Sequence, residues 1–222
     1  LLDAGDMFIR GGTLDLQLEV FRSLRFDALV PGNGECDAPD TADRMGRLEC
    51  PVVLTNVQAF PALPRTVPHM VRRFGDYKVG ILGLTVANSS RQSHLGSDKN
   101  DLATEITNPV DAAREVVPRL RESVDIIIAL SHLGTDADAK LAKSVPGIDL
   151  IVGGHSHHCL HEPLFAGTSA LVQAGSQGAY LGVVEIEMDD SSRELSISGR
   201  LESIWQEIEP DRSLEKLVIQ HY

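Results

Sequence analysis

The stretch Val124-Asp125-Ile126-Ile127-Ile128-Ala129-Leu130 is an almost continuous apolar run, and it leads directly into the histidine loop Ser131-His132-Leu133-Gly134. A second apolar run, residues 148–152, leads into Gly153-Gly154-His155-Ser156-His157. Such runs predict strands that are buried on both faces, as in parallel sheets. A short helix is predicted between them at residues 137–144, so both histidine loops are expected at carboxyl ends of strands, where sites in open α/β sheets form.

Strands and helices also alternate on both sides of this unit. Helices are predicted after Thr13 and after Asn108, where Pro109 can occupy the first helical position. Residues 31–43 are expected to form a turn-rich loop, and a final helix is expected from Ser213. Strands are predicted at residues 1–4, 27–30, 52–55, 77–84, 170–173, 180–188 and 194–204, the last three as an antiparallel meander, and residues 67–74 are expected to form a basic, edge-like segment. This pattern predicts an α/β domain in which two sheets pack together with helices outside.

Composition narrows the class of protein and of partner. The chain has 222 residues, of which 42% are hydrophobic and 23% charged, as in a single soluble globular domain. The net charge of −12 argues against a nucleic acid or an anionic membrane as the main partner, and no run approaches the roughly 20 apolar residues of a membrane helix. A small anionic substrate remains possible if bound divalent cations reverse the local field.

Five residues at predicted strand ends are candidate metal ligands. His155 and His157 lie two residues apart on a glycine-supported loop, and His132 ends the preceding strand, so the three imidazoles can face one centre. Asp6 and Asn33 each follow a strand and a glycine, where either is also an ordinary turn residue. The alternative for the histidines is a set of solvated loop residues. All five together suit a two-metal hydrolase whose nitrogen and oxygen ligands favour Mn, Zn or Fe.

The same stretches resemble the calcineurin-like metallophosphoesterases, and more narrowly their 5'-nucleotidase branch. The resemblance rests on Leu2-Asp3-Ala4-Gly5-Asp6, on residues 27–37, on Ser131-His132-Leu133-Gly134 and on residues 147–157, and it extends over essentially the whole chain. It implies a four-layer α/β/β/α domain, built from two mixed sheets flanked by helices, with two divalent metal ions that hydrolyse phosphate esters.

The resemblance also implies a role for each candidate ligand. Asp6 would bridge the two metals, Asn33, His132 and His155 would hold one of them, and His157 would bind the other. A metal-bound hydroxide would then attack the phosphorus of a small phosphoester or nucleotide in line with the leaving group.

Two departures from the family pattern are expected to matter. The family's first motif, Asp-x-His, is not found before Asp6, so we expect a fragment truncated at its N-terminus. Gly34 stands where the family carries a catalytic histidine, and Asp37, which would orient that histidine, is a weak catalytic candidate without its partner. Acid–base assistance of that kind is typically worth about 10²–10⁴-fold.

These departures leave two alternatives open beside a 5'-nucleotidase-type hydrolase. One is a relative with altered chemistry, resembling the thiosulfohydrolases, and the other is a catalytically impaired metal-binding domain. Residues 1–222 are expected to form one domain, with residues 208–222 connecting to a C-terminal substrate domain that lies outside this chain. The resemblance further implies a periplasmic or extracellular location.

Overall fold

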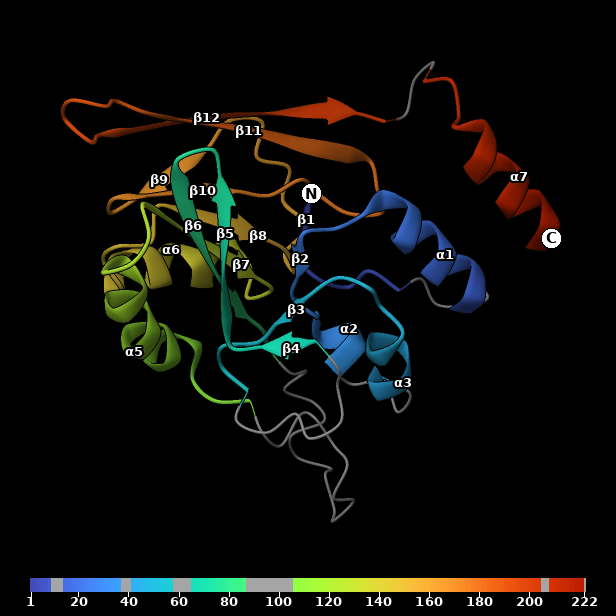
Figure 1. Ribbon diagram of the computed structural model, residues 1–222, viewed down its shortest axis with the longest axis horizontal. Coiled ribbons are helices and arrows are strands. Elements are labelled where there is room, and N and C mark those ends of the chain that lie inside the picture. Colours follow the sequence, from blue (N-terminus) through green and yellow to red (C-terminus); the bar gives the residue numbers. More distant parts are fainter. Residues whose placement is uncertain (9–13, 37–40, 58–64, 87–105, 205–207, 222) are drawn as a thin grey trace, which may run out of the picture.

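The computed structural model describes residues 1–8, 14–36, 41–57, 65–86, 106–204 and 208–221, and a six-stranded sheet lies at its centre (Figure 1). Its middle strands β6, β7, β8 and β10 are parallel, and β5 and β9 pair antiparallel at its two edges. In spatial order the strands are β5 (His69–Phe74), β6 (Tyr77–Leu84), β7 (Ile126–Ser131), β8 (Leu150–Gly153), β10 (Ser169–Val172) and β9 (Leu164–Ala166).

A second, four-stranded sheet packs against the first. It is parallel throughout and contains β1 (Leu2–Asp3), β2 (Ala28–Leu29), β3 (Val52–Val53) and β4 (Thr66–Val67). The antiparallel pair β11 (Tyr180–Met188) and β12 (Leu195–Ser203) forms its own two-stranded ladder, and its apolar side chains pack against the core between the two larger sheets. The predicted three-stranded meander is therefore wrong: β11 and β12 form a separate antiparallel ribbon, whereas β10 joins the six-stranded sheet parallel to β8.

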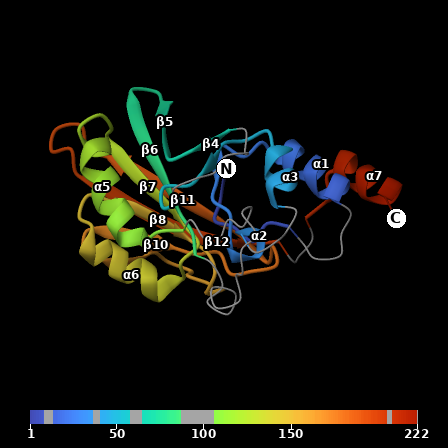
Figure 2. The ribbon, with the colours of Figure 1, turned by 90° about the horizontal axis from the view of Figure 1, so that it is seen from below.

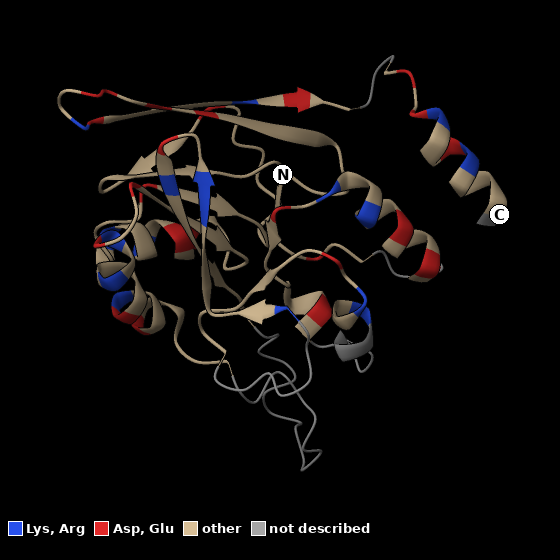
Figure 3. Ribbon diagram, viewed as in Figure 1, with Lys and Arg blue, Asp and Glu red and all other residues tan. Residues whose placement is uncertain are grey.

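Helices cover both outer faces, which gives the layer order α/β/β/α and confirms the expected fold class (Figures 1 and 2). Of the two sheets expected to be mixed, only the six-stranded one is. One face carries α5 (Pro109–Arg121) and α6 (Thr135–Ser144), while α1 (Leu14–Leu24), α2 (Asn33–Cys36) and α3 (Thr41–Gly46) lie on the side of the four-stranded sheet. The final helix α7 (Arg212–His221) contacts α1. Acidic and basic residues both occur along α1, α5 and α7, as expected of solvated helix faces (Figure 3).

Strand β7 shows why the sequence builds two cores. Ile126, Ile128 and Leu130 face the other sheet, whereas Ile127 and Ala129 face α5 and α6, because successive side chains of a strand point to opposite faces. A strand buried on both sides needs the continuous apolar run seen in the sequence. The two histidine loops follow β7 and β8, which are parallel neighbours, as predicted.

The structure corrects the prediction of a loop at residues 31–43. Its described part contains the short helices α2 and α3, and α2 begins at the candidate ligand Asn33. Glycine, proline and asparagine favour turns in isolation, but here hydrogen bonds to the loop after the first strand hold one helical turn. Strand β9 has no counterpart among the predicted strands. No helix in the described ranges combines the length and apolar character needed to cross a bilayer.

Candidate metal centre

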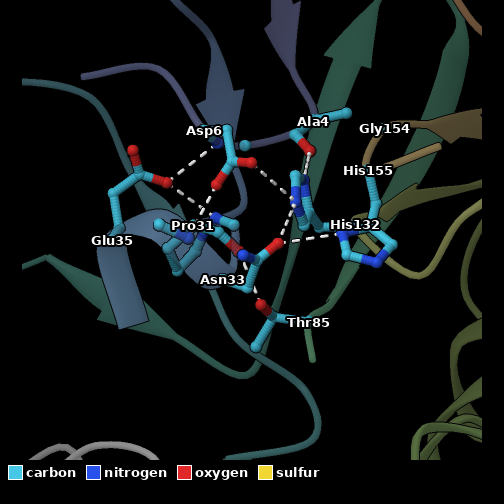
Figure 4. Close-up of polar contacts among 12 residues, drawn as sticks. Ala4, Asp6, Pro31, Asn33, Glu35, Thr85, His132, Gly154 and His155 are labelled. Carbon is cyan, nitrogen blue, oxygen red and sulfur yellow. Dashed lines mark hydrogen bonds and ion pairs between the residues drawn. The ribbon is translucent and has the colours of Figure 1, made fainter. Parts of the chain in front are cut away.

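Four of the five candidate ligands meet where strands of the two sheets end (Figure 4). Asp6 follows β1, Asn33 begins α2 after β2, and His132 and His155 follow β7 and β8. Their side chains point toward one another, although the outermost two, Asp6 and His155, lie 149 residues apart in the chain. The fold thus brings together what the sequence showed only as separate turns.

The amide oxygen of Asn33 is the shared contact of the cluster. Asn33 Oδ1 lies 3.1 Å from Nε2 of His132 and 2.8 Å from Nδ1 of His155. Nε2 of His132 also lies 3.3 Å from Oδ2 of Asp6. The two imidazole rings meet edge to face with their centroids 5.1 Å apart.

The orientation of His132 brings several hydrogen-bond acceptors together in this cluster. Its Nδ1 lies 2.6 Å from the carbonyl oxygen of Ala4, which can only accept a hydrogen bond, so Nδ1 carries the proton. In the neutral ring, Nε2 then carries a lone pair that faces the oxygens of Asp6 and Asn33. These oxygens are hydrogen-bond acceptors as well. Three acceptors that face one another need a proton or a metal ion between them.

The pKa values of the three ionisable side chains reflect the same arrangement. Burial alone would lower the pKa of His132, but the hydrogen bond and negative charge of Asp6 outweigh it and raise that pKa. Burial would raise the pKa of Asp6, and the hydrogen bond and charge of His132 bring it below its ordinary value instead. Burial, together with the charge of His132, lowers the pKa of His155. These effects favour the neutral form of His155, which is the form that binds metal ions.

Two glycines allow the backbone to close around the His132 ring, which is only 1% exposed. A Cβ atom on Gly5 would lie 2.6 Å from Nδ1 of His132, and one on Gly154 would lie 3.0 Å from the same atom. Gly5 also has a φ of +94°, which residues with a side chain rarely adopt. Each of these glycines directly precedes a candidate ligand. Close packing against the His132 ring therefore explains why glycine stands before Asp6 and before His155.

Glu35 is a residue of the site that the sequence analysis did not identify. Its side chain is buried, and Oε2 accepts hydrogen bonds from the backbone N–H groups of Asp6 and Gly32, both at 2.8 Å. Oε1 accepts a third from Phe8 at 3.1 Å. Glu35 therefore fixes the loop that carries Asp6 against the loop that carries Asn33. The sequence indicated a role for Glu35 only through its position two residues after Asn33, within the stretch of residues 27–37 that resembles the family.

The remaining candidates lie less centrally. His157 is exposed, and within the described ranges it makes no hydrogen bond or ring contact with the other four, although its charge contributes to lowering the pKa of His155. Asp37 lies outside the described residues. Gly34 donates its N–H to Oδ1 of Asp6 at 2.7 Å, and a Cβ there would lie 2.8 Å from that oxygen.

The distances between these oxygen and nitrogen atoms are compatible with one divalent ion between them. Ligand atoms that share one cation at bond lengths of about 2.1 Å lie about 3 Å apart, and the separations here are 2.8, 3.1 and 3.3 Å. Within the described part of the chain, no three His, Cys, Asp or Glu side chains are placed to hold a metal by themselves. A metal ion at this site would therefore need the amide oxygen of Asn33 as a further ligand.

Known proteins are similar to this chain in both sequence and fold. Residues 1–159 match the sequence profile of the calcineurin-like phosphoesterase family. Human 5'-nucleotidase is 30% identical in a match that covers 90% of this chain and 39% of that protein. The trifunctional nucleotide phosphoesterase YfkN of Bacillus subtilis is 29% identical, with 86% of this chain and 16% of YfkN covered. The chain thus spans less than half the length of these curated relatives.

Solved structures agree with this assignment. The 5'-nucleotidase precursor from Thermus thermophilus has a TM-score of 0.78 at 27% identity, covering 99% of this chain and 48% of that one. The sulfate thiohydrolase SoxB from the same species has a TM-score of 0.82 at 20% identity, over 99% and 42% of the two chains, which shows a common fold. Because the family profile covers well over half of the chain, including all five candidate ligands, the protein belongs to the calcineurin-like phosphoesterase family.

Proposed function

We propose that this chain is the metal-binding domain of a phosphoester hydrolase of the 5'-nucleotidase type. The observation that carries the proposal is that the side chains of Asp6, Asn33, His132 and His155 point toward one another, with Oδ1 of Asn33 in contact with both imidazoles (Figure 4). Membership of the phosphoesterase family and relatives named 5'-nucleotidase support the same activity.

In this proposal those four residues hold one divalent ion, and Asp6 also contributes to a second ion whose ligands include His157. Two such ions would activate water and neutralise the charge of the phosphoryl group during its transfer. Two further residues orient the ligands. The carbonyl of Ala4 sets the tautomer of His132, and Glu35 holds the Asp6 loop in place.

The proposed substrate is a nucleotide or a related small phosphomonoester. With a net charge of −12, the chain would repel a phosphate unless cations at the site reverse the local field. Recognition of a nucleobase would fall to a C-terminal domain beyond the connector at residues 208–222. A periplasmic or extracellular location is part of the same proposal, and a snake venom 5'-nucleotidase from Crotalus adamanteus is among the relatives.

Phosphate release tests the proposal directly. The full-length gene product, loaded with Mn²⁺, should release phosphate from AMP and from p-nitrophenyl phosphate, and a chelator should abolish the release. His155→Ala should lose it as well, whereas His161→Ala, which changes an exposed histidine outside the cluster, should retain it. Binding of Mn²⁺ without hydrolysis of either compound would favour the impaired metal-binding domain instead.

A further inference from the structure

The loop that carries His155 and His157 has an unfavourable backbone conformation. The φ angles are +71° at His155 and +59° at His157, in the left-handed region that residues with a Cβ avoid. Such conformations persist only where surrounding contacts over-determine them, and they cluster at functional sites. The contacts that hold this loop therefore affect the positions of His155 and His157.

The side chain of Gln173 provides these contacts from one buried position. Gln173 follows β10 and is only 3% exposed. Its Nε2 donates to the carbonyl oxygen of Gly154, immediately before His155. Its Oε1 accepts from the backbone N–H of His158 at 2.6 Å, immediately after His157, and from the hydroxyl of Ser156 at 2.9 Å. One amide group thus engages the loop before, between and after its two histidines.

The surrounding hydrogen bonds connect this amide to the fold. The Ser156 hydroxyl also accepts from the backbone N–H of Thr135, the first residue of α6, at 3.1 Å. The backbone of Gln173 accepts a hydrogen bond from Leu160 N at 3.0 Å, so the chain that leaves the loop also pairs with the segment after β10. Gln173 is therefore fixed with respect to the six-stranded sheet and can impose a geometry on the loop.

We propose that Gln173 is a positioning residue that holds the loop of residues 154–158 in the conformation in which His155 contacts Asn33 and His132. The consequence for metal binding rests on the proposed function, whereas the consequence for loop geometry does not. Outer-shell partners of metal ligands typically affect metal affinity by about 10–100-fold.

The test uses Gln173→Met, which keeps the approximate size of the side chain and removes its hydrogen bonds. Ser169→Ala is the matched control, because it removes another buried hydrogen bond, from the hydroxyl of Ser169 to the carbonyl of Ile148, at the opposite end of β10. In the ion-free protein, hydrogen exchange should show lost protection of the His158 amide in Gln173→Met alone. By calorimetry, Mn²⁺ affinity should fall about 10–100-fold in Gln173→Met and stay unchanged in Ser169→Ala.

Each result has a definite meaning. If Gln173→Met keeps both the protection of the His158 amide and the wild-type Mn²⁺ affinity, the backbone pairing alone positions the loop and the proposal is wrong. If the wild-type protein binds no Mn²⁺, the proposed function fails, and the exchange of the His158 amide still decides the role of Gln173. If Gln173→Met does not fold, Gln173→Glu replaces it, because Glu keeps the acceptor for His158 but loses the donor to Gly154. Its Mn²⁺ affinity should still fall, and an affinity equal to that of the wild type would overturn the proposal.

Discussion

At the scale of single residues, the site is organised around the imidazole of His132. The carbonyl of Ala4 fixes one ring nitrogen, and the other faces oxygens of Asp6 and Asn33. The sequence predicted these ligands because each ends a strand next to a glycine or an apolar run. It did not predict Glu35 or Gln173, because their partners are backbone groups of distant loops that no local pattern reveals.

Gly34 gives a test of the missing imidazole. Gly34→His should raise phosphate release relative to Gly34→Ala, by up to about 10²–10⁴-fold if the new ring protonates the leaving group. Alanine is the matched control, because any Cβ at this position would lie 2.8 Å from Oδ1 of Asp6 and displace that carboxylate. Equal rates in the two variants would mean that the absence of a histidine does not limit this protein.

Asp138 should make stability depend on pH. Its buried carboxyl accepts a hydrogen bond from the hydroxyl of Ser131, and burial raises its pKa to about 7. Between about pH 4 and pH 7 the folded state keeps a proton that the unfolded chain has lost, so stability falls as pH rises through this range. Asp138→Asn removes this loss. The free energy of unfolding of the variant relative to wild type should rise by about 3 kcal/mol from pH 5 to pH 8.

Urea unfolding in the presence of a chelator measures this difference. Asp136→Asn, a change of an exposed carboxylate on the same helix α6, is the control and should follow the wild-type dependence on pH. A constant offset between Asp138→Asn and wild type at both pH values would show that Asp138 is already ionised at pH 5 in the folded protein.

At the scale of elements, the success of sequence-based prediction follows burial and length. The strands expected at residues 77–84 and 180–188 match β6 and β11, because long apolar or alternating runs leave little freedom in their assignment. Helix α2 has four residues and its sequence predicts a turn, since its stability comes from contacts with the Asp6 loop rather than from its own sequence.

Helix α5 offers a prediction about its first turn. Oδ1 of Asn108 accepts hydrogen bonds from the backbone N–H groups of Val110 and Asp111, at 2.9 and 3.2 Å. Asn108→Ala should reduce the free energy of unfolding by about 1 kcal/mol, because these two donors lose their acceptor. Asn108→Asp keeps an acceptor and should unfold within a few tenths of a kcal/mol of wild type in urea. An unchanged midpoint for Asn108→Ala would show that water replaces the cap without cost.

At the scale of the whole molecule, two sheets from different parts of the chain build one site. Neither sheet contains it alone, because Asp6 and Asn33 follow strands of one sheet and His132 and His155 follow strands of the other. The sequence could predict two packed sheets from the alternation of elements. The contact of their strand ends is a property of packing, and only the family resemblance indicated it in advance.

We propose that these strand ends share one divalent ion through Asn33. Calorimetric titration of Mn²⁺ into the chelator-treated protein measures this binding, with Asn33→Ala as the variant and His161→Ala as the control. Wild type and His161→Ala should bind Mn²⁺ alike, and Asn33→Ala should lose at least about 10–100-fold in affinity. Wild-type protein that binds no Mn²⁺, or Asn33→Ala that binds it as tightly as wild type, would rule out an ion shared through Asn33.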